Sequence, residues 1–119
     1  MGAGDGAVIS IYAAFERPGL FGKVAIQSLF MLDLRDDVPA LIENSPPQDL
    51  DLYIEWSRLD FKDEPRRDAR AESREIVKVL EKKGYAPVTG EVADGTGWGG
   101  WRLRTDRVLE TLFPLEETP

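Results

Sequence analysis

The chain has 119 residues and a formal net charge of −7 at pH 7, and it contains neither cysteine nor histidine. It therefore cannot form disulfides, zinc sites of the His/Cys kind, or the Ser-His-Asp and Cys-His groups of nucleophilic catalysis. Its acidity argues against broad attraction to nucleic acids or anionic lipids, since both require a positive surface. The length predicts a single domain over residues 7–113, with a flexible N-terminus at 1–6 and a flexible tail at 114–119.

Residues 7–35 contain the first two predicted elements. Residues 7–16, AVISIYAAFE, are rich in β-branched and aromatic side chains and have apolar residues on both faces, which predicts a buried strand. Residues 23–35, KVAIQSLFMLDLR, alternate in a way that favours a second strand, although their length and their leucine and methionine content also suit a buried helix. Two strands would form a long hairpin over residues 7–34, whereas a helix would make this region part of a βα unit.

The apolar run near the N-terminus does not resemble a targeting segment. No positively charged region precedes it, and it reaches Glu16 early, unlike a signal peptide or a membrane span. We therefore expect a soluble, cytoplasmic protein without a membrane anchor.

Residues 36–84 contain three more predicted elements. Residues 36–47 are typical of a short helix, because Pro39 fits its first turn and a Pro-Pro pair follows it. Residues 50–57 alternate between apolar and more polar side chains, which predicts a strand with one buried face and one solvent-facing face. Residues 63–84 have apolar side chains every three or four positions, which predicts a long helix capped by Asp63 and ended by Gly84. The strand's solvent-facing side would contain Asp51, Tyr53, Glu55 and Ser57.

The C-terminal third predicts two strands and a helix. Residues 85–93, YAPVTGEVA, and residues 100–105, GWRLRT, are typical of strands joined by a glycine-rich loop. Residues 106–113, DRVLETLF, predict a last short helix, whose start is placed at Thr105 or Asp106. The whole pattern predicts an α+β fold with a mixed, mostly antiparallel sheet of about five strands, and one long and two short helices packed mainly on one face. If residues 20–33 are helical, the element order is βαβαββα.

Gly95, Gly97 and Gly100 match the G-x-G-x-x-G pattern of dinucleotide-binding loops. Such a loop requires a helix after it, because the helix N-terminus supplies free N–H groups to the phosphates. The residues that follow predict a strand, and an acidic residue about 20 positions onward would fall in the terminal tail. We therefore interpret the stretch as a hairpin loop and expect no cofactor.

The same stretch contains the first candidate binding residues, Trp98, Trp101, Arg102 and Arg104. Tryptophan and arginine are enriched at the energetic centres of protein interfaces. Trp98 lies among glycines, which predicts an exposed indole, whereas Trp101 begins the predicted strand and is expected to pack. Plain packing of both aromatic side chains is the alternative.

Arg70 and Arg74 are the second candidate pair. They belong to a row of cations at i,i+4 spacing on the predicted long helix, and neither has a carboxylate three or four positions away. One interpretation is a ridge that binds phosphate, nucleic acid or an acidic protein face. In the other, Arg70 covers the core edge and pairs with an acidic strand, while Arg74 is solvated.

The remaining candidates are carboxylates and aromatic side chains. Asp33, Asp36 and Asp37 form an acidic cluster, but its spacing matches no calcium loop, so we expect no metal site there. We therefore predict a non-enzymatic protein-binding module, such as an adaptor, an inhibitor or an immunity-like protein. The alternatives are a carboxylate-based, Mg-dependent enzyme and a small-ligand-binding domain, whose predicted pocket lining is Phe15, Phe30, Trp56 and Trp101.

Overall fold

The main sheet has four strands in the order β1-β2-β3-β6, and each neighbouring pair is parallel. The computed structural model describes residues 1–31, 34–60, 62–64, 67–95 and 97–116. The strands of the main sheet are β1 (Gly2–Ala3), β2 (Lys23–Gln27), β3 (Asp51–Leu59) and β6 (Val88–Gly95). A separate antiparallel ladder pairs β4 (Lys62–Glu64) with β5 (Arg67–Asp68). Because the main strands are neighbours in chain order, each connection moves one step across the sheet.

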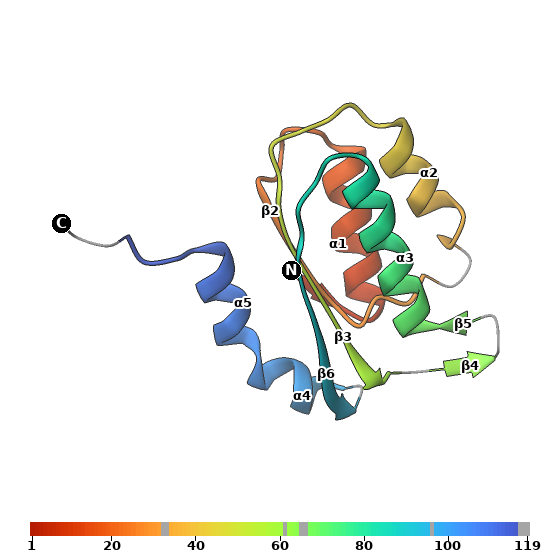
Figure 1. The fold of residues 1–119 in the computed structure, drawn as a ribbon, viewed down its shortest axis with the longest axis vertical. Helices are drawn as coiled ribbons and strands as arrows, with labels where there is room; N and C mark the ends of the chain where they lie inside the picture. The colour runs from red at the N-terminus through yellow and green to blue at the C-terminus, as the bar shows by residue number, and fades with distance from the viewer. Residues whose placement is uncertain (32–33, 61, 65–66, 96, 117–119) are drawn as a thin grey trace.

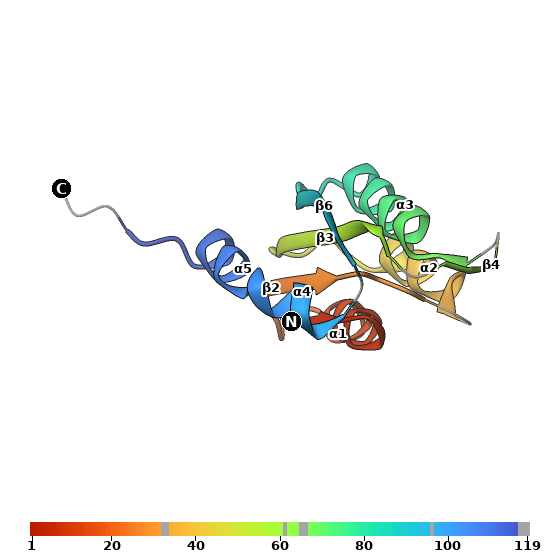
Figure 2. The same ribbon diagram turned by 90° about the horizontal axis from the view of Figure 1, so that it is seen from below.

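Helices cover both faces of this sheet. They are α1 (Asp5–Glu16), α2 (Asp37–Asn44), α3 (Ala69–Lys82), α4 (Trp98–Leu103) and α5 (Thr105–Leu112). The first three connect successive parallel strands and lie on one face, whereas α4 and α5 follow β6 and lie on the other (Figures 1 and 2). No helix within the described ranges is long and apolar enough to cross a membrane.

The larger hydrophobic core lies between the sheet and helices α1 to α3. Val24 and Ile26 of β2 and Leu52 and Ile54 of β3 point to this side. The helices supply the facing side chains Ile11, Phe15, Ile42, Ile76 and Leu80. A smaller cluster on the opposite face joins Ala25 and Tyr53 of the strands to Val108 and Leu112 of α5. Alternate residues of β2 and β3 are therefore buried in different layers.

The predicted fold class is wrong in its sheet and in its helices. The main sheet is parallel and four-stranded rather than mostly antiparallel with about five strands, and the described residues form five helices rather than three. Residues 7–16, predicted as a strand, form most of α1, so the hairpin over residues 7–34 does not exist. Ala7, Ile11, Ala14 and Phe15 are buried in α1 at spacings of three and four, and this helical period outweighs the strand propensity of valine and isoleucine.

The predicted strand over residues 100–105 is also wrong. This segment continues α4 and begins α5, and its buried residues Trp101, Arg104 and Val108 recur at helical spacing. The two helices cover the face of β3 that the alternation predicts to meet solvent. Tyr53, Glu55 and Ser57 are consequently buried. Parallel sheets are normally covered on both faces, and strand alternation alone does not reveal a second layer.

Several predicted elements are confirmed. The strands β2, β3 and β6 and the helices α2, α3 and α5 overlap the segments predicted for them, although β2 ends at Gln27 and is much shorter than the predicted strand over residues 23–35. The start of α3 differs, since Asp68 rather than Asp63 accepts the first-turn N–H groups, those of Arg70 and Ala71. Gly84 ends α3 with φ +102°, the left-handed conformation predicted there.

Candidate ligand-binding cavity

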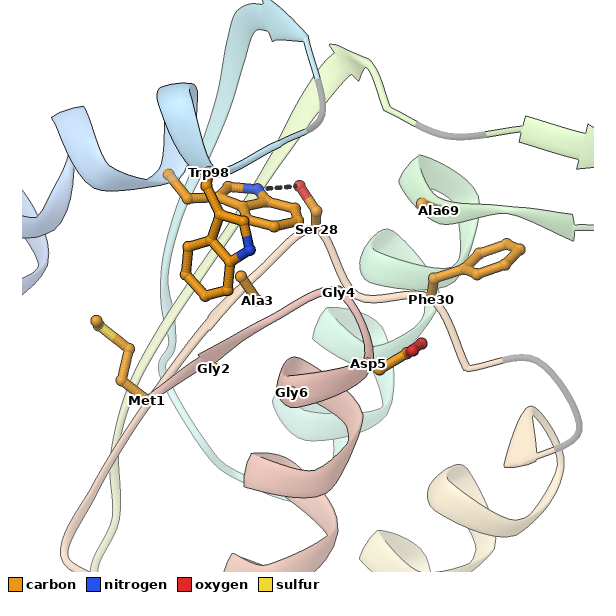
Figure 3. Close-up of a pocket in the computed structure, with 11 residues that line it drawn as sticks. Met1, Gly2, Ala3, Gly4, Asp5, Gly6, Ser28, Phe30, Ala69 and Trp98 are labelled. Atoms are coloured by element: carbon orange, nitrogen blue, oxygen red, sulfur yellow. Dashed lines mark hydrogen bonds between the residues drawn. The ribbon is translucent and has the colours of Figure 1, made fainter.

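A cavity of about 610 Å³ opens at the carboxyl ends of β1 and β2. Residues 1–6 form one side of it, Ser28 and Phe30 follow β2, Ala69 begins α3, and Trp98 and Trp101 come from α4 (Figure 3). Elements from both faces of the sheet therefore meet at this edge.

Two glycines shape the segment between β1 and α1. A side chain at Gly2 would collide with the carbonyl oxygen of Gly6. Glycine at this position therefore allows β1 to lie close to α1. Gly4 has φ +57°, and its N–H donates a hydrogen bond of 3.0 Å to the carbonyl of Gln27. Gly4 also has no side chain to cap α1. The first turn of α1 therefore begins next to the cavity without a side-chain cap.

Ser28 is the non-glycine residue with positive φ among those described, at +55°. Its Oγ donates to Asp60 Oδ1 at 2.8 Å and accepts from Trp101 Nε1 at 2.9 Å. Its N–H donates to the carbonyl of Glu55 at 2.9 Å. These bonds hold a conformation that serine rarely adopts, which is typical of residues that shape a site.

The two tryptophans differ in their surroundings. Trp101 is buried and is held through its bond to Ser28, whereas 68% of Trp98 is exposed. Their rings meet edge to face, with centroids 5.3 Å apart and planes at 87°. Trp101 thus forms a fixed wall, and Trp98 packs against it as an exposed flank of the cavity.

A buried polar network lies next to this wall, centred on Glu55, which is 1% exposed. Oε1 of Glu55 accepts hydrogen bonds from Gln27 Nε2 at 2.6 Å and from Arg104 Nε at 2.8 Å, and Oε2 accepts one from the Tyr53 hydroxyl at 2.8 Å. Gln27 Nε2 also lies 3.3 Å from the carbonyl oxygen of Trp101. The network therefore joins β2, β3 and α4. Burial, and then the bond to Glu55, raise the pKa of Tyr53 from 10.0 to about 12.

Glu72 is a second buried carboxyl, in the first turn of α3. Its Oε2 accepts a hydrogen bond of 2.9 Å from the N–H of Met31, while Oε1 has no hydrogen-bond partner among the residues described. Burial raises the pKa of this carboxyl, and the Met31 bond opposes that rise. Glu72 does not line the cavity.

The predicted binding residues fall into different places. Trp98 and Trp101 line the cavity, Arg102 is exposed on α4, and Arg104 is a buried partner of Glu55. The predicted exposure of Trp98 and the burial of Trp101 are what the structure shows.

Arg70 and Arg74 lie on α3, on the other face of the sheet from α4 (Figure 1). Nε of Arg70 is 3.7 Å from Asp68 Oδ1. Nη2 of Arg74 is 2.6 Å from Glu91 Oε1, and its guanidinium lies 5.9 Å from the centre of the Trp56 ring. Each arginine thus has an acidic neighbour, and neither belongs to the tryptophan site.

The glycine-rich stretch differs from its prediction. A helix follows Gly97, not the predicted strand, so a following strand does not exclude a phosphate loop here. However, α4 has six residues and Gly100 lies inside it. The glycines that line the cavity are those of residues 2–6 instead.

The other predicted candidates contribute little to the cavity. Asp36 and Asp37 begin α2, Asp33 lies outside the described residues, and no group of carboxylates within the described ranges could hold a metal ion. Of the predicted small-ligand lining, Phe30 and Trp101 line the cavity, whereas Phe15 belongs to the main core and Trp56 packs against it.

Sequence reasoning missed Gly2, Gly4, Ser28 and Glu55. The alternating glycines at positions 2, 4 and 6 before a helical apolar pattern were the available signal for the first pair. Ser28 and Glu55 carry no local signal, because their positions depend on β2, β3 and α4 meeting in space.

No protein-family model matches this chain, and a comparison with curated proteins finds no similar sequence. The geometry of the cavity is therefore the basis for a functional argument.

Proposed function

We propose that this protein binds a small molecule in the cavity at the carboxyl edge of its sheet. The observation that supports this most is the cavity itself, since about 610 Å³ lies within the range of roughly 300–1,000 Å³ that is usual for ligand sites. Its position supports the same proposal, because ligands of open α/β sheets bind outside the carboxyl ends of the strands.

The lining suits a ligand with an apolar body. Two indoles and Phe30 offer apolar surface, and the glycine-rich segment between β1 and α1 offers backbone polar groups. Trp101 is held by Ser28, so part of the site is preformed and little ordering is required when a ligand enters.

The test is a thermal-shift screen of a library of soluble metabolites against wild type, Trp98→Ala and Leu103→Ala. Leu103 is the matched control, because it is also exposed on α4 but does not line the cavity. Compounds that stabilise wild type and Leu103→Ala but not Trp98→Ala support the proposal, since a ligand stabilises the state that it binds. Compounds that stabilise all three proteins equally would contradict it.

The protein-binding module predicted from the sequence is a second candidate. It is favoured by the exposure of apolar side chains on α4, which reaches 68% at Trp98 and 78% at Leu103. For this candidate, Leu103→Ala weakens association with a protein partner while small-molecule binding is unchanged. Nucleic-acid binding by the Arg70 and Arg74 ridge and a cytoplasmic location stay predictions from the sequence.

A further inference from the structure

The cavity lining contains two charged groups, the carboxylate of Asp5 and the α-amino group of Met1. Of the side chains that line it, that of Asp5 is the charged one, and no lysine or arginine of the described chain takes part. The chain as a whole has a net charge of −7, which raises the local concentration of cations near its surface.

Asp5 lies in the first turn of α1, where the helix dipole must be considered. A helix N-terminus acts as roughly +0.5 of an elementary charge, and a carboxylate supplies a full negative charge. The two together leave this end of the cavity negative. An anionic ligand group at the start of α1 would therefore face repulsion from Asp5.

The lining residues are arranged along the segment from β1 to α1. Figure 3 shows Asp5 and Phe30 on one side of Gly4, and Trp98 with Met1 toward the other end. A carboxylate and an aromatic side chain thus lie on the same side of Gly4, and this end of the cavity is suited to an ammonium group, because carboxylates and the faces of aromatic rings both attract cations. The indole of Trp98 offers apolar contact to the remainder of a ligand.

We propose, on the basis of the proposed function above, that the ligand is a free organic amine with an apolar or aromatic body. The ammonium lies by Asp5 and Phe30, and the body packs against Trp98 and Trp101. This orientation also separates the ammonium from the α-amino group of Met1, which lies at the opposite end of the segment (Figure 3).

The experiment compares ligands of similar shape and different charge. 2-Phenylethylamine, 2-phenylethanol and 3-phenylpropionate are titrated into wild type by isothermal calorimetry at neutral pH. The amine is expected to bind about fivefold more tightly than the alcohol, as one partly exposed ion pair allows. The acid is expected to bind most weakly.

Two variants locate the effect. Asp5→Asn should reduce the preference for the amine over the alcohol to near one, while binding of the alcohol is unchanged. Asp106→Asn is the matched control, because Asp106 is likewise acidic and exposed in the first turn of a helix but does not line the cavity. It makes the same change in net charge and should leave the amine preference intact.

Several outcomes would overturn the inference. Equal binding of the amine and the alcohol, preference for the acid, or binding of none of the three ligands each contradict an amine site. The proposed function would survive these outcomes if other compounds still distinguished wild type from Trp98→Ala. Tighter binding of Nα-acetyl-lysine methylamide than of phenylethylamine would assign the cavity to a lysine of a protein partner, and the free amine would be wrong.

Discussion

Replacement of Arg104 by methionine tests the buried network on the second face of the sheet. The variant leaves Glu55, which is 1% exposed, without its charged partner at 2.8 Å. Removal of one member of a buried ion pair costs about 3–5 kcal/mol, a large part of the total of about 5–15 kcal/mol for a domain. At about 4 °C per kcal/mol for a chain of this length, we expect Tm to fall by about 12–20 °C.

A double-mutant cycle measured by urea unfolding identifies the cause. Glu55→Gln combined with Arg104→Met removes the buried charge as well as its partner, so the double variant should lose less free energy of unfolding than the two single variants summed. Arg102→Met is the control, since Arg102 is exposed two positions earlier and its loss should cost less than about 0.5 kcal/mol. Strict additivity, or a loss below about 1 kcal/mol for Arg104→Met, would refute the reasoning.

Three further predictions concern single residues. Gly4→Ala should lower the free energy of unfolding in urea by about 1–2 kcal/mol, because Gly4 has φ +57°. Gly6→Ala within α1, where a side chain has open space, should raise it by about 0.5–1 kcal/mol. Equal effects of the two substitutions would show that the backbone conformation of Gly4 does not require glycine. Tyr53→Phe should lower the free energy of unfolding by about 1–3 kcal/mol at neutral pH. Because the pKa of Tyr53 is raised from 10.0 to about 12, wild type should lose this extra stability as pH rises through that range, whereas the variant should not. Equal stability of the two proteins at neutral pH would exclude a stabilising bond to Glu55. Burial raises the pKa of Glu72, so folding favours the protonated form of this carboxyl. As pH rises above 4.5, wild type should therefore lose free energy of unfolding relative to Glu72→Gln. A difference in free energy of unfolding that stays constant from about pH 4 to 8 would contradict this.

The elements that were predictable have strong local signals. The helix α3 has a sustained apolar period and ends at Gly84, and β3 has a clear alternation. The helix α1 was not predictable by composition, because its valine, isoleucine and aromatic residues also suit a strand. One wrong assignment there changed the sheet. Residues 7–16 were predicted to form a hairpin with the following strand, whereas they belong to the helix that connects the parallel strands β1 and β2.

The site was predictable only in part. Trp98 stood out because three glycines surround it closely in sequence, and its indole is exposed. Arg104 was a candidate because it lies close to the two tryptophans in sequence. In the structure its guanidinium instead donates a hydrogen bond to Glu55, 49 positions earlier in the chain. Local sequence does not contain that contact, since it arises only when α5 packs on β3 and brings Arg104, the residue before it, to Glu55.

Stability and ligand binding depend on different residues of the segment from α4 to the start of α5, and this separation makes the functional proposal testable. Trp101 is held by two hydrogen bonds, from its indole N–H to Ser28 and from Gln27 to its carbonyl oxygen. Gln27 also donates to Glu55, so Trp101 is connected to the buried polar network. Trp98 has a T-shaped contact with Trp101 and an otherwise exposed ring, so its truncation should alter the cavity with little cost in stability. Loss of Arg104 should cost much stability and alter the cavity little, because Arg104 belongs to the buried polar network and does not line the cavity. A protein in which both variants lost stability equally would have no independent cavity wall, and Trp98 would be a core residue in energetic terms.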